Sequence, residues 1–319
     1  MAPFDQEDVP GTILLFDRGG TDEQRHAHQG DIILHPQPSL DPEDPLNWRR
    51  SRKKLAVSMV YLYTFAIGIC TAAQYSILTP ISKSQKVSIG QLNSGTGFMQ
   101  LMQGWGCLLW QPIALTYGRR FVYIVTIVLS TGPVLWTPFS HGAGQWYAHR
   151  ILLGLFCSPV ESLPEVSVPD LFFAHERGRY MALYAFILFG SNFLAPFFAG
   201  FIADGMDWRW VMYFSTILMV ICSTIMFLFT EDTIYFRETM EGVEPTTSKF
   251  ATTQADTEQR QETDESRQEI QSSKSRLRKL SLITRVPGRP TKMQMLLKSW
   301  MSLKIIVLFP NILWAGLLY

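Results

Sequence analysis

Apolar residues dominate the chain between Leu55 and Thr230, where short polar gaps divide it into six stretches. Five of the stretches hold no Asp, Glu, Lys or Arg over 21 to 32 residues. Their bracketing residues are Lys54 and Lys83, Lys86 and Arg119, Arg120 and Arg150, Arg179 and Asp204, and Arg209 and Glu231. A helix needs roughly 20 apolar residues to cross the ~30 Å hydrocarbon core of a bilayer. The surface helices of soluble proteins alternate polar and apolar faces instead. The pattern therefore predicts an all-α membrane protein with six transmembrane helices, expected within residues 49–230.

Polar segments flank this bundle. Residues 1–48 are rich in Asp, Gly, Pro, Gln and His, which predicts a disordered N-terminus. Residues 231–298 are polar and become basic toward their end, which predicts a long loop beside the membrane. Residues 299–319 are expected to start a seventh transmembrane helix. Its uncharged part, Ile305–Tyr319, has 15 residues and is too short to cross comfortably.

Positive charge predicts the orientation in the membrane. Five basic residues directly precede the first stretch: Arg49, Arg50, Arg52, Lys53 and Lys54. The successive loops carry 2, 2, 0, 2 and 1 Lys or Arg residues. Since cytosolic flanks are enriched in Lys and Arg, we expect the N-terminus and the 231–298 loop to be cytosolic.

Composition excludes several other classes. A net charge of +1 argues against a nucleic-acid partner, which would favour a strong basic excess. The four cysteines stand singly in apolar stretches without metal-ligand spacing, so we expect no metal site, no disulfide framework and no cofactor. No motif of an enzyme is evident.

The remaining stretch, about Trp146–Asp170, carries charge in its interior. Arg150, Glu161 and Glu165 would be costly in a membrane unless paired or hydrated. The two glutamates are four residues apart and share a helix face. At ~1.5 Å per residue, Glu161 lies roughly 20 Å from Trp146, past the midplane toward the cytosol. The pair is expected to exchange a proton or bind a cation; the alternative is a structural role, held by arginines at helix ends or by nearby amides.

Uncharged polar side chains interrupt three other stretches. Gln74 and Tyr75 lie in the first, Gln100 and Gln103 in the second, and Asn192 in the fifth. They either line a solute cavity or hydrogen-bond neighbouring helices together, and both interpretations remain open.

Three short motifs follow one another along the predicted helices. They read Tyr117-Gly118-Arg119-Arg120 after the second stretch, Arg150-Ile-Leu-Leu-Gly154 in the fourth, and Ala195-Pro196-Phe-Phe-Ala199-Gly200 in the fifth. They resemble the Gly-x-x-x-Asp-Arg-x-Gly-Arg-Arg, Arg-x-x-x-Gly and antiporter-type Gly-Pro-x-x-Gly-Gly signatures of the major facilitator superfamily. The order and placement of the motifs identify residues 40–235 as similar to the N-terminal half of such a transporter. Residues 161–179 and 41–48 look closest to fungal drug:proton antiporters, including a polyamine and cation exporter branch.

The first motif departs from the family's pattern. The family's glycine and acid would fall at Gln111 and Leu115, so the acid is missing. Asp170 is then the expected anionic partner of Arg119, while the alternative role of Arg119 and Arg120 is cytosolic anchoring. Gly118 is expected to allow the sharp turn between two helices.

The resemblance gives the other motif residues roles as well. Arg150 looks like the family's proton-coupling arginine, with the alternative that it extends to the exterior surface. Gly154 belongs to the same motif. Pro196 and Gly200 present a small-residue face for close helix packing, and the family adds a hinge against the second half.

The resemblance implies a secondary transporter that exports small organic cations or drugs in exchange for protons, by alternating access of two halves. The alternatives are a uniporter, a nutrient or cation importer, and a seven-span receptor. Expected partners are a cationic or amphipathic organic solute, protons, membrane lipids, and either the missing C-terminal half or a second copy. We expect the plasma membrane, with the vacuolar membrane as the alternative.

Overall fold

A computed structural model of the chain describes residues 44–235, together with Pro36 and Leu308. The predicted seventh helix, the loop beyond residue 235 and most of the predicted N-terminal disorder lie outside these residues. Within residues 44–235 every regular element is a helix, so the predicted all-α class is confirmed.

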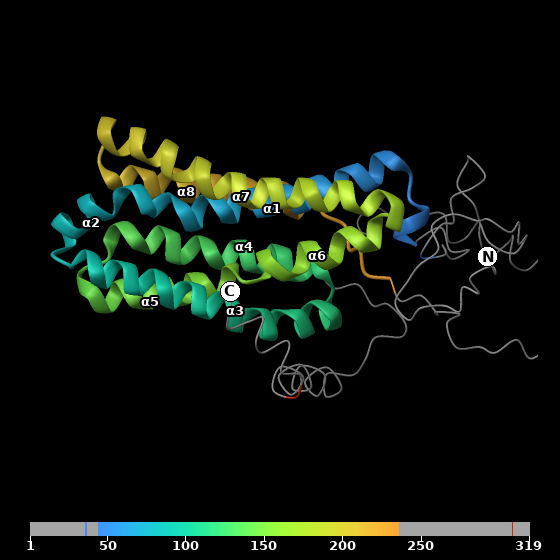
Figure 1. The fold of residues 1–319 in the computed structure, drawn as a ribbon, viewed down its shortest axis with the longest axis horizontal. Helices are drawn as coiled ribbons and strands as arrows, with labels where there is room; N and C mark the ends of the chain where they lie inside the picture. Colours follow the sequence, from blue (N-terminus) through green and yellow to red (C-terminus); the bar gives the residue numbers. More distant parts are fainter. Residues whose placement is uncertain (1–35, 37–43, 236–307, 309–319) are drawn as a thin grey trace, which may run out of the picture.

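Each of the six predicted stretches forms one helix or a short series of helices (Figure 1). In chain order these are α1 (Arg50–Ala72) with η2 (Ala73–Ile77) and α2 (Leu78–Gln85); α3 (Ile89–Tyr117); α4 (Arg119–Trp136) with η3 (Thr137–Phe139); α5 (Gly142–Cys157) with α6 (Pro159–Leu171); α7 (Ala174–Gly205); and α8 (Trp208–Phe229). A short 3-10 turn, η1 (Pro45–Asn47), precedes them. Among the described residues, five of the six are long and apolar enough to cross a membrane. The exception, α3, has 29 residues and is interrupted by four glutamines and an asparagine.

Local sequence signals set several helix boundaries. Ser88 and Gln91 form a reciprocal capping box at the start of α3, which satisfies amides that lack an intrahelical partner. Gly118 separates α3 from α4 with a φ of 107°, a conformation that side chains disfavour. Pro159 opens α6, where its missing amide hydrogen costs little. The predicted stretch over Trp146–Asp170 thus contains two helices, with Ser158 between them.

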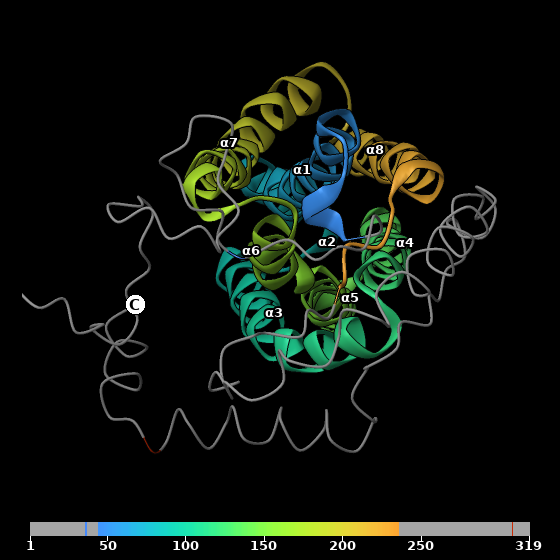
Figure 2. The same cartoon turned by 90° about the vertical axis from the view of Figure 1, so that its right-hand side faces the viewer.

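The helices form two groups that pack side by side. Figure 1 shows α1, α7 and α8 on one side and α3, α4 and α5 on the other, and Figure 2 views the same bundle end-on. The core between the groups holds Tyr63 of α1, whose ring meets Tyr123 of α4 edge-on at 4.8 Å. The Tyr63 hydroxyl shares a 2.9 Å hydrogen bond with Thr126, so the core contains a satisfied polar contact.

Small residues allow the closest packing, between α3 and α5. A Cβ atom at Gly154 would collide with the backbone carbonyl of Met99. A Cβ atom at Gly95 would likewise collide with the Trp146 ring. Glycine at these two positions lets the helix backbones approach, as is common between transmembrane helices.

One end of the bundle, which we call the Arg119 end, gathers residues 44–52, 117–120, 172–174 and 230–235. The last residues of the predicted disordered segment, 44–48, are ordered here. The Asp44 side chain accepts a hydrogen bond from the Leu46 amide at 3.0 Å, and Lys53 donates to the Leu46 carbonyl at 2.8 Å. Trp48 is buried against a small apolar cluster that includes Leu171. The chain therefore enters the bundle through a fixed turn.

Candidate functional site

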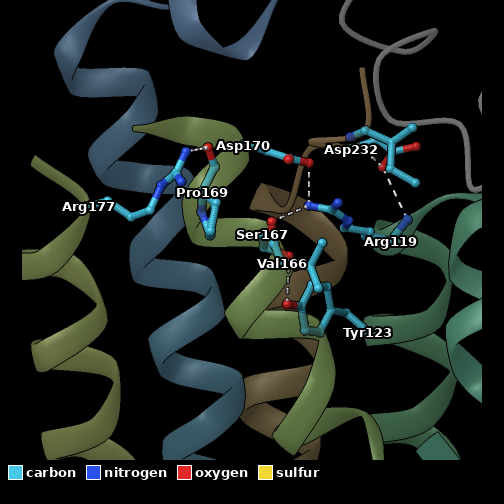
Figure 3. Close-up of polar contacts among 9 residues, drawn as sticks. Arg119, Tyr123, Val166, Ser167, Pro169, Asp170, Arg177 and Asp232 are labelled. Carbon is cyan, nitrogen blue, oxygen red and sulfur yellow. Dashed lines mark hydrogen bonds and ion pairs between the residues drawn. The ribbon is translucent and has the colours of Figure 1, made fainter. Parts of the chain in front are cut away.

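Arg119 is the centre of the polar contacts at the Arg119 end (Figure 3). The sequence places it in the first position of α4, directly after the Gly118 turn. Its guanidinium forms a 2.5 Å ion pair with Asp170 of α6 and donates to the Val166 carbonyl at 3.0 Å. The contact between Arg119 and Asp170 expected from the sequence is therefore present, and it joins α4 to α6.

A second carboxylate reaches the same turn from the far end of α8. The backbone amide of Arg119 donates to Asp232 at 3.2 Å (Figure 3). Gly118 makes room for this carboxylate, since a Cβ atom at that position would collide with it. The α3–α4 turn thus requires glycine both for its backbone angle and for the space beside it.

Two further contacts tie α8 and the segment after it to the other helices. Arg120 is buried and donates to the Phe227 carbonyl of α8 at 2.9 Å. Arg52 of α1 forms an ion pair with Glu231, with a 2.7 Å hydrogen bond from its Nε, and it stacks on the Trp48 ring. Acids and arginines from four segments therefore interlock at one end of the bundle.

The end of α6 is held by contacts with its neighbours as well. The hydroxyls of Tyr123 and Ser167 share a 3.0 Å hydrogen bond, and Arg177 of α7 donates to the Pro169 carbonyl at 3.2 Å (Figure 3). That carbonyl lies in the last turn of α6, where carbonyl groups lack intrahelical partners. These contacts fix Asp170 in place for Arg119.

Glu161 and Glu165 lie further along α6, away from the Arg119 end, and both are exposed. Glu161 accepts a 3.1 Å hydrogen bond from the Gln103 amide of α3. Of the predicted polar residues, Gln103 and Glu161 are thus brought together. The amide contact fits the structural alternative, while the exposure of both carboxylates leaves them open to a proton or a cation.

Arg150 does not extend to the surface, so that alternative is wrong. Its side chain is 1% exposed and lies over the Trp146 ring at 4.4 Å. Its Nε and Nη2 atoms are buried without a hydrogen-bond partner among the described residues.

The other predicted polar residues are dispersed. Gln74 is buried and makes a long 3.5 Å contact with Thr96 of α3, which favours the helix-joining interpretation. Asn192 donates to the Leu188 carbonyl of its own helix at 2.8 Å. Gln100 is exposed and Tyr75 is 41% exposed.

The face of α7 with Pro196 and Gly200 is open on the described part of the molecule. No atom lies within 4 Å of a Cβ built at Gly200. Its role in packing or as a hinge stays a prediction. Gly154, in contrast, packs against α3, as described above.

Sequence reasoning missed the acids at the end of α8. Glu231 and Asp232 follow a 22-residue apolar helix directly, and that position places them at the same end as the basic cluster before α1. Because successive membrane-spanning helices end on alternate sides, the sequence could have placed these two acids beside the basic residues of α1. Sequence reasoning also missed His149, which is fully buried beside Arg150 with both ring nitrogens unbonded among the described residues.

Comparison with known proteins identifies the family. The family model of the Major Facilitator Superfamily matches residues 60–319. An uncharacterised MFS-type transporter of Schizosaccharomyces pombe is 30% identical over 72% of this chain and 40% of its own length. Protein HOL1 of Saccharomyces cerevisiae is 28% identical over 66% of this chain and 37% of its own. The efflux pump bik6 of Gibberella fujikuroi is 27% identical over 64% of this chain and 42% of its own.

The aligned part of this chain spans about two fifths of the length of these relatives. Helices α1 to α8 lie in the first part of the matched region, apart from the first residues of α1, which precede residue 60. With an all-helical bundle, helices able to cross a membrane and a family match over most of its length, this chain belongs to the Major Facilitator Superfamily, whose members are carriers and not enzymes.

Proposed function

We propose that this chain supplies the N-terminal half of a secondary transporter that exports small organic cations or drugs in exchange for protons. The family, and the relative bik6, which is an efflux pump, support the general activity. A second bundle of helices is needed to enclose a solute for alternating access. The chain alone is therefore expected not to transport.

The observation that carries the proton-coupled part is the position of Glu161. It is an exposed carboxylate in the first turn of α6, with Glu165 one turn further on the same face. The Gln103 amide at 3.1 Å orients it from α3. A carboxylate in an apolar span is costly unless it has a function or a partner. Protonation of Glu161 would neutralise the site and release a bound cation, which couples the two fluxes.

The contacts at the Arg119 end supply the second element of the proposal. Arg119, Asp170 and Asp232 join three segments by charge-assisted contacts at one end of the bundle. Such contacts are strong when formed and can be exchanged without breaking the helices themselves. We infer that they hold this end closed in one state of the transport cycle.

The test is a flux measurement in proteoliposomes that contain this chain joined to the C-terminal half of the transporter. Radiolabelled tetraphenylphosphonium serves as the organic cation, and a pH gradient drives the exchange. We expect Glu161→Gln to abolish gradient-driven flux while protein yield stays unchanged. Asp204→Asn is the matched control, because Asp204 is exposed at the end of α7 and should leave the flux unaltered.

Three results would count against this proposal. Wild-type flux in the Glu161→Gln variant would assign Glu161 a structural role. Saturable flux that persists after the pH gradient is dissipated would favour a uniporter. Saturable, gradient-driven flux by the 319-residue chain alone would show that a second half is not required.

We also propose that the Arg119 end faces the cytosol and that the protein resides in the plasma membrane. The five basic residues before and within the first turns of α1 support this orientation. A protease should remove a tag at residue 5 from intact spheroplasts only after the membrane is permeabilised. Removal before permeabilisation would place that end outside.

A further inference from the structure

Arg150 is a buried cation whose counter-ion is absent from the described part of the chain. Its side chain is 1% exposed in the middle of α5. Other arginines of residues 44–235 have acidic partners, since Arg52 pairs with Glu231, Arg119 with Asp170 and Arg209 with Asp207. Arg150 has no such partner among these residues. The nearest acids along its own span, Glu161 and Glu165, are 11 and 15 residues away. At ~1.5 Å per residue these separations are about 16 and 22 Å, too far for an ion pair.

The guanidinium is nevertheless held in one position. It lies over the Trp146 ring at 4.4 Å, which is a favourable cation–π contact. The Trp146 indole is fixed in turn, because its Nε1 donates to the Leu92 carbonyl of α3 at 3.2 Å. The absence of a side chain at Gly95 leaves the space that the indole fills. The cation is therefore positioned by α3 before any ligand arrives.

Unbonded polar atoms lie on the same turn of α5. Arg150 Nε and Nη2 and both ring nitrogens of His149 are buried without hydrogen-bond partners among residues 44–235. The His149 ring meets the Trp146 ring edge-on at 5.0 Å, so histidine and arginine share the same indole. Leaving a buried donor unsatisfied is costly, and leaving a buried charge unpaired costs more. An anion placed here would pair with the buried charge of Arg150 and would accept hydrogen bonds from its unbonded Nε and Nη2 atoms.

Tyr75 marks the side from which a ligand would approach. It lies near Arg150 and is 41% exposed. A planar guanidinium matches a carboxylate with two parallel hydrogen bonds, which an ammonium cannot offer.

We propose that Arg150 is the recognition site for an acidic group of the transported solute, with a carboxylate as its simplest form. The inference rests on the proposed function, because it names a second recognition group of the same solute. The solute would then carry an acid for Arg150 in addition to the cationic or amphipathic part recognised near Glu161. An acidic side chain supplied from outside residues 44–235 is the competing explanation.

The test is equilibrium binding to the purified 319-residue chain in nanodiscs, without any gradient. The probes are radiolabelled benzoate, benzylamine and benzyl alcohol, which share one ring and differ in charge. The buffer contains chloride, so that a simple inorganic anion does not account for the signal. We expect saturable binding of benzoate, and at least ~10-fold weaker binding of the other two, the size of one charge-assisted hydrogen bond.

Three variants make the assignment specific. Arg150→Gln should weaken benzoate binding at least ~10-fold. Arg150→Lys, which keeps the charge but loses the planar fork, should retain an intermediate affinity. Arg209→Gln is the control, because Arg209 is an exposed arginine at the start of α8 and should leave binding unchanged.

Several results would overturn the inference. They are equal binding of the three probes by the wild type, no benzoate binding by the folded wild type, and full benzoate binding by Arg150→Gln. If Arg150→Gln fails to fold, the inference is still tested by the preference of the wild type among the three probes and by the benzoate affinity of Arg150→Lys. Glu161→Gln should keep benzoate binding. Benzoate binding by a wild-type protein that shows no proton-coupled flux would refute the proposed function alone.

Discussion

The Gly118 turn gives a prediction whose magnitude follows from the structure. With a φ of 107° and a ψ of 150°, Gly118 occupies a backbone region reached almost only by glycine, and an alanine there costs about 1–3 kcal/mol. The added Cβ would also displace the Asp232 carboxylate from the Arg119 amide, which now lies 3.2 Å away. A hydrogen bond to a charged group contributes about 1.5–3 kcal/mol. We therefore expect Gly118→Ala to lower the free energy of unfolding by about 2–6 kcal/mol.

Thermal unfolding of the purified chain in detergent measures this loss. Cys70, Cys157 and Cys222 are buried and should react with a thiol-reactive dye only when the bundle opens. For a domain of this size each kcal/mol shifts the unfolding midpoint by roughly 2–4 °C, so we expect a fall of about 5–20 °C.

Gly132→Ala is the matched control for this experiment. Gly132 lies within α4, and a Cβ built there meets no atom within 4 Å. Alanine in a helix interior is favoured over glycine by about 0.5–1 kcal/mol, so the midpoint should stay or rise slightly. Equal midpoints for Gly118→Ala and the wild type would refute the argument that the turn requires glycine.

The same assay checks two further predictions. Asp170→Asn should destabilise the protein by about 1–3 kcal/mol, because it leaves the nearly buried Arg119 without its carboxylate. Asp207→Asn, which breaks an exposed ion pair, should change stability by less than about 1 kcal/mol, and a similar loss in both variants would contradict the burial argument. Gly154→Ala should lower the free energy of unfolding by about 1–3 kcal/mol, because the added methyl group forces α5 away from α3. Gly200→Ala is the control, since no atom lies near that position. Unchanged stability of both variants would refute the argument that α3 and α5 pack closely at Gly154.

The long apolar stretches were sufficient to predict six helical segments, but not the breaks within the first, third and fourth of them. In water-free hydrocarbon every backbone amide and carbonyl must be hydrogen-bonded within the protein, which few backbone conformations allow. The length and apolarity of a stretch therefore determine its type of secondary structure. The turn at Gly118 was predictable for the same kind of reason, since a sharp reversal between two long helices needs a residue without a side chain. The partner of Arg119 was predictable because Asp170 is an acid at the matching end of its span.

Side-chain burial and the contacts between distant segments were not predictable. The sequence shows that Arg150 lies inside an apolar stretch, but helix rotation decides whether it faces α3 or the surface. The ion pair between Arg52 and Glu231 joins residues 179 positions apart, and periodicity carries no information on such a pair. The ordered turn at Asp44–Trp48 depends on an apolar patch that only the packing of α1 with α6 creates.

The interruption at Ser158 has a mechanical consequence. A continuous helix through this span would act as a stiff rod and transmit any tilt at Asp170 directly to Arg150. Pro159 has no amide hydrogen to bond back across the joint, so the two halves are linked by a softer pivot. Helix α5 packs closely against α3 at Gly154, while α6 is joined to α4 by the ion pair between Asp170 and Arg119. A tilt at the Arg119 end is therefore transmitted less directly to Arg150 than a continuous helix would transmit it.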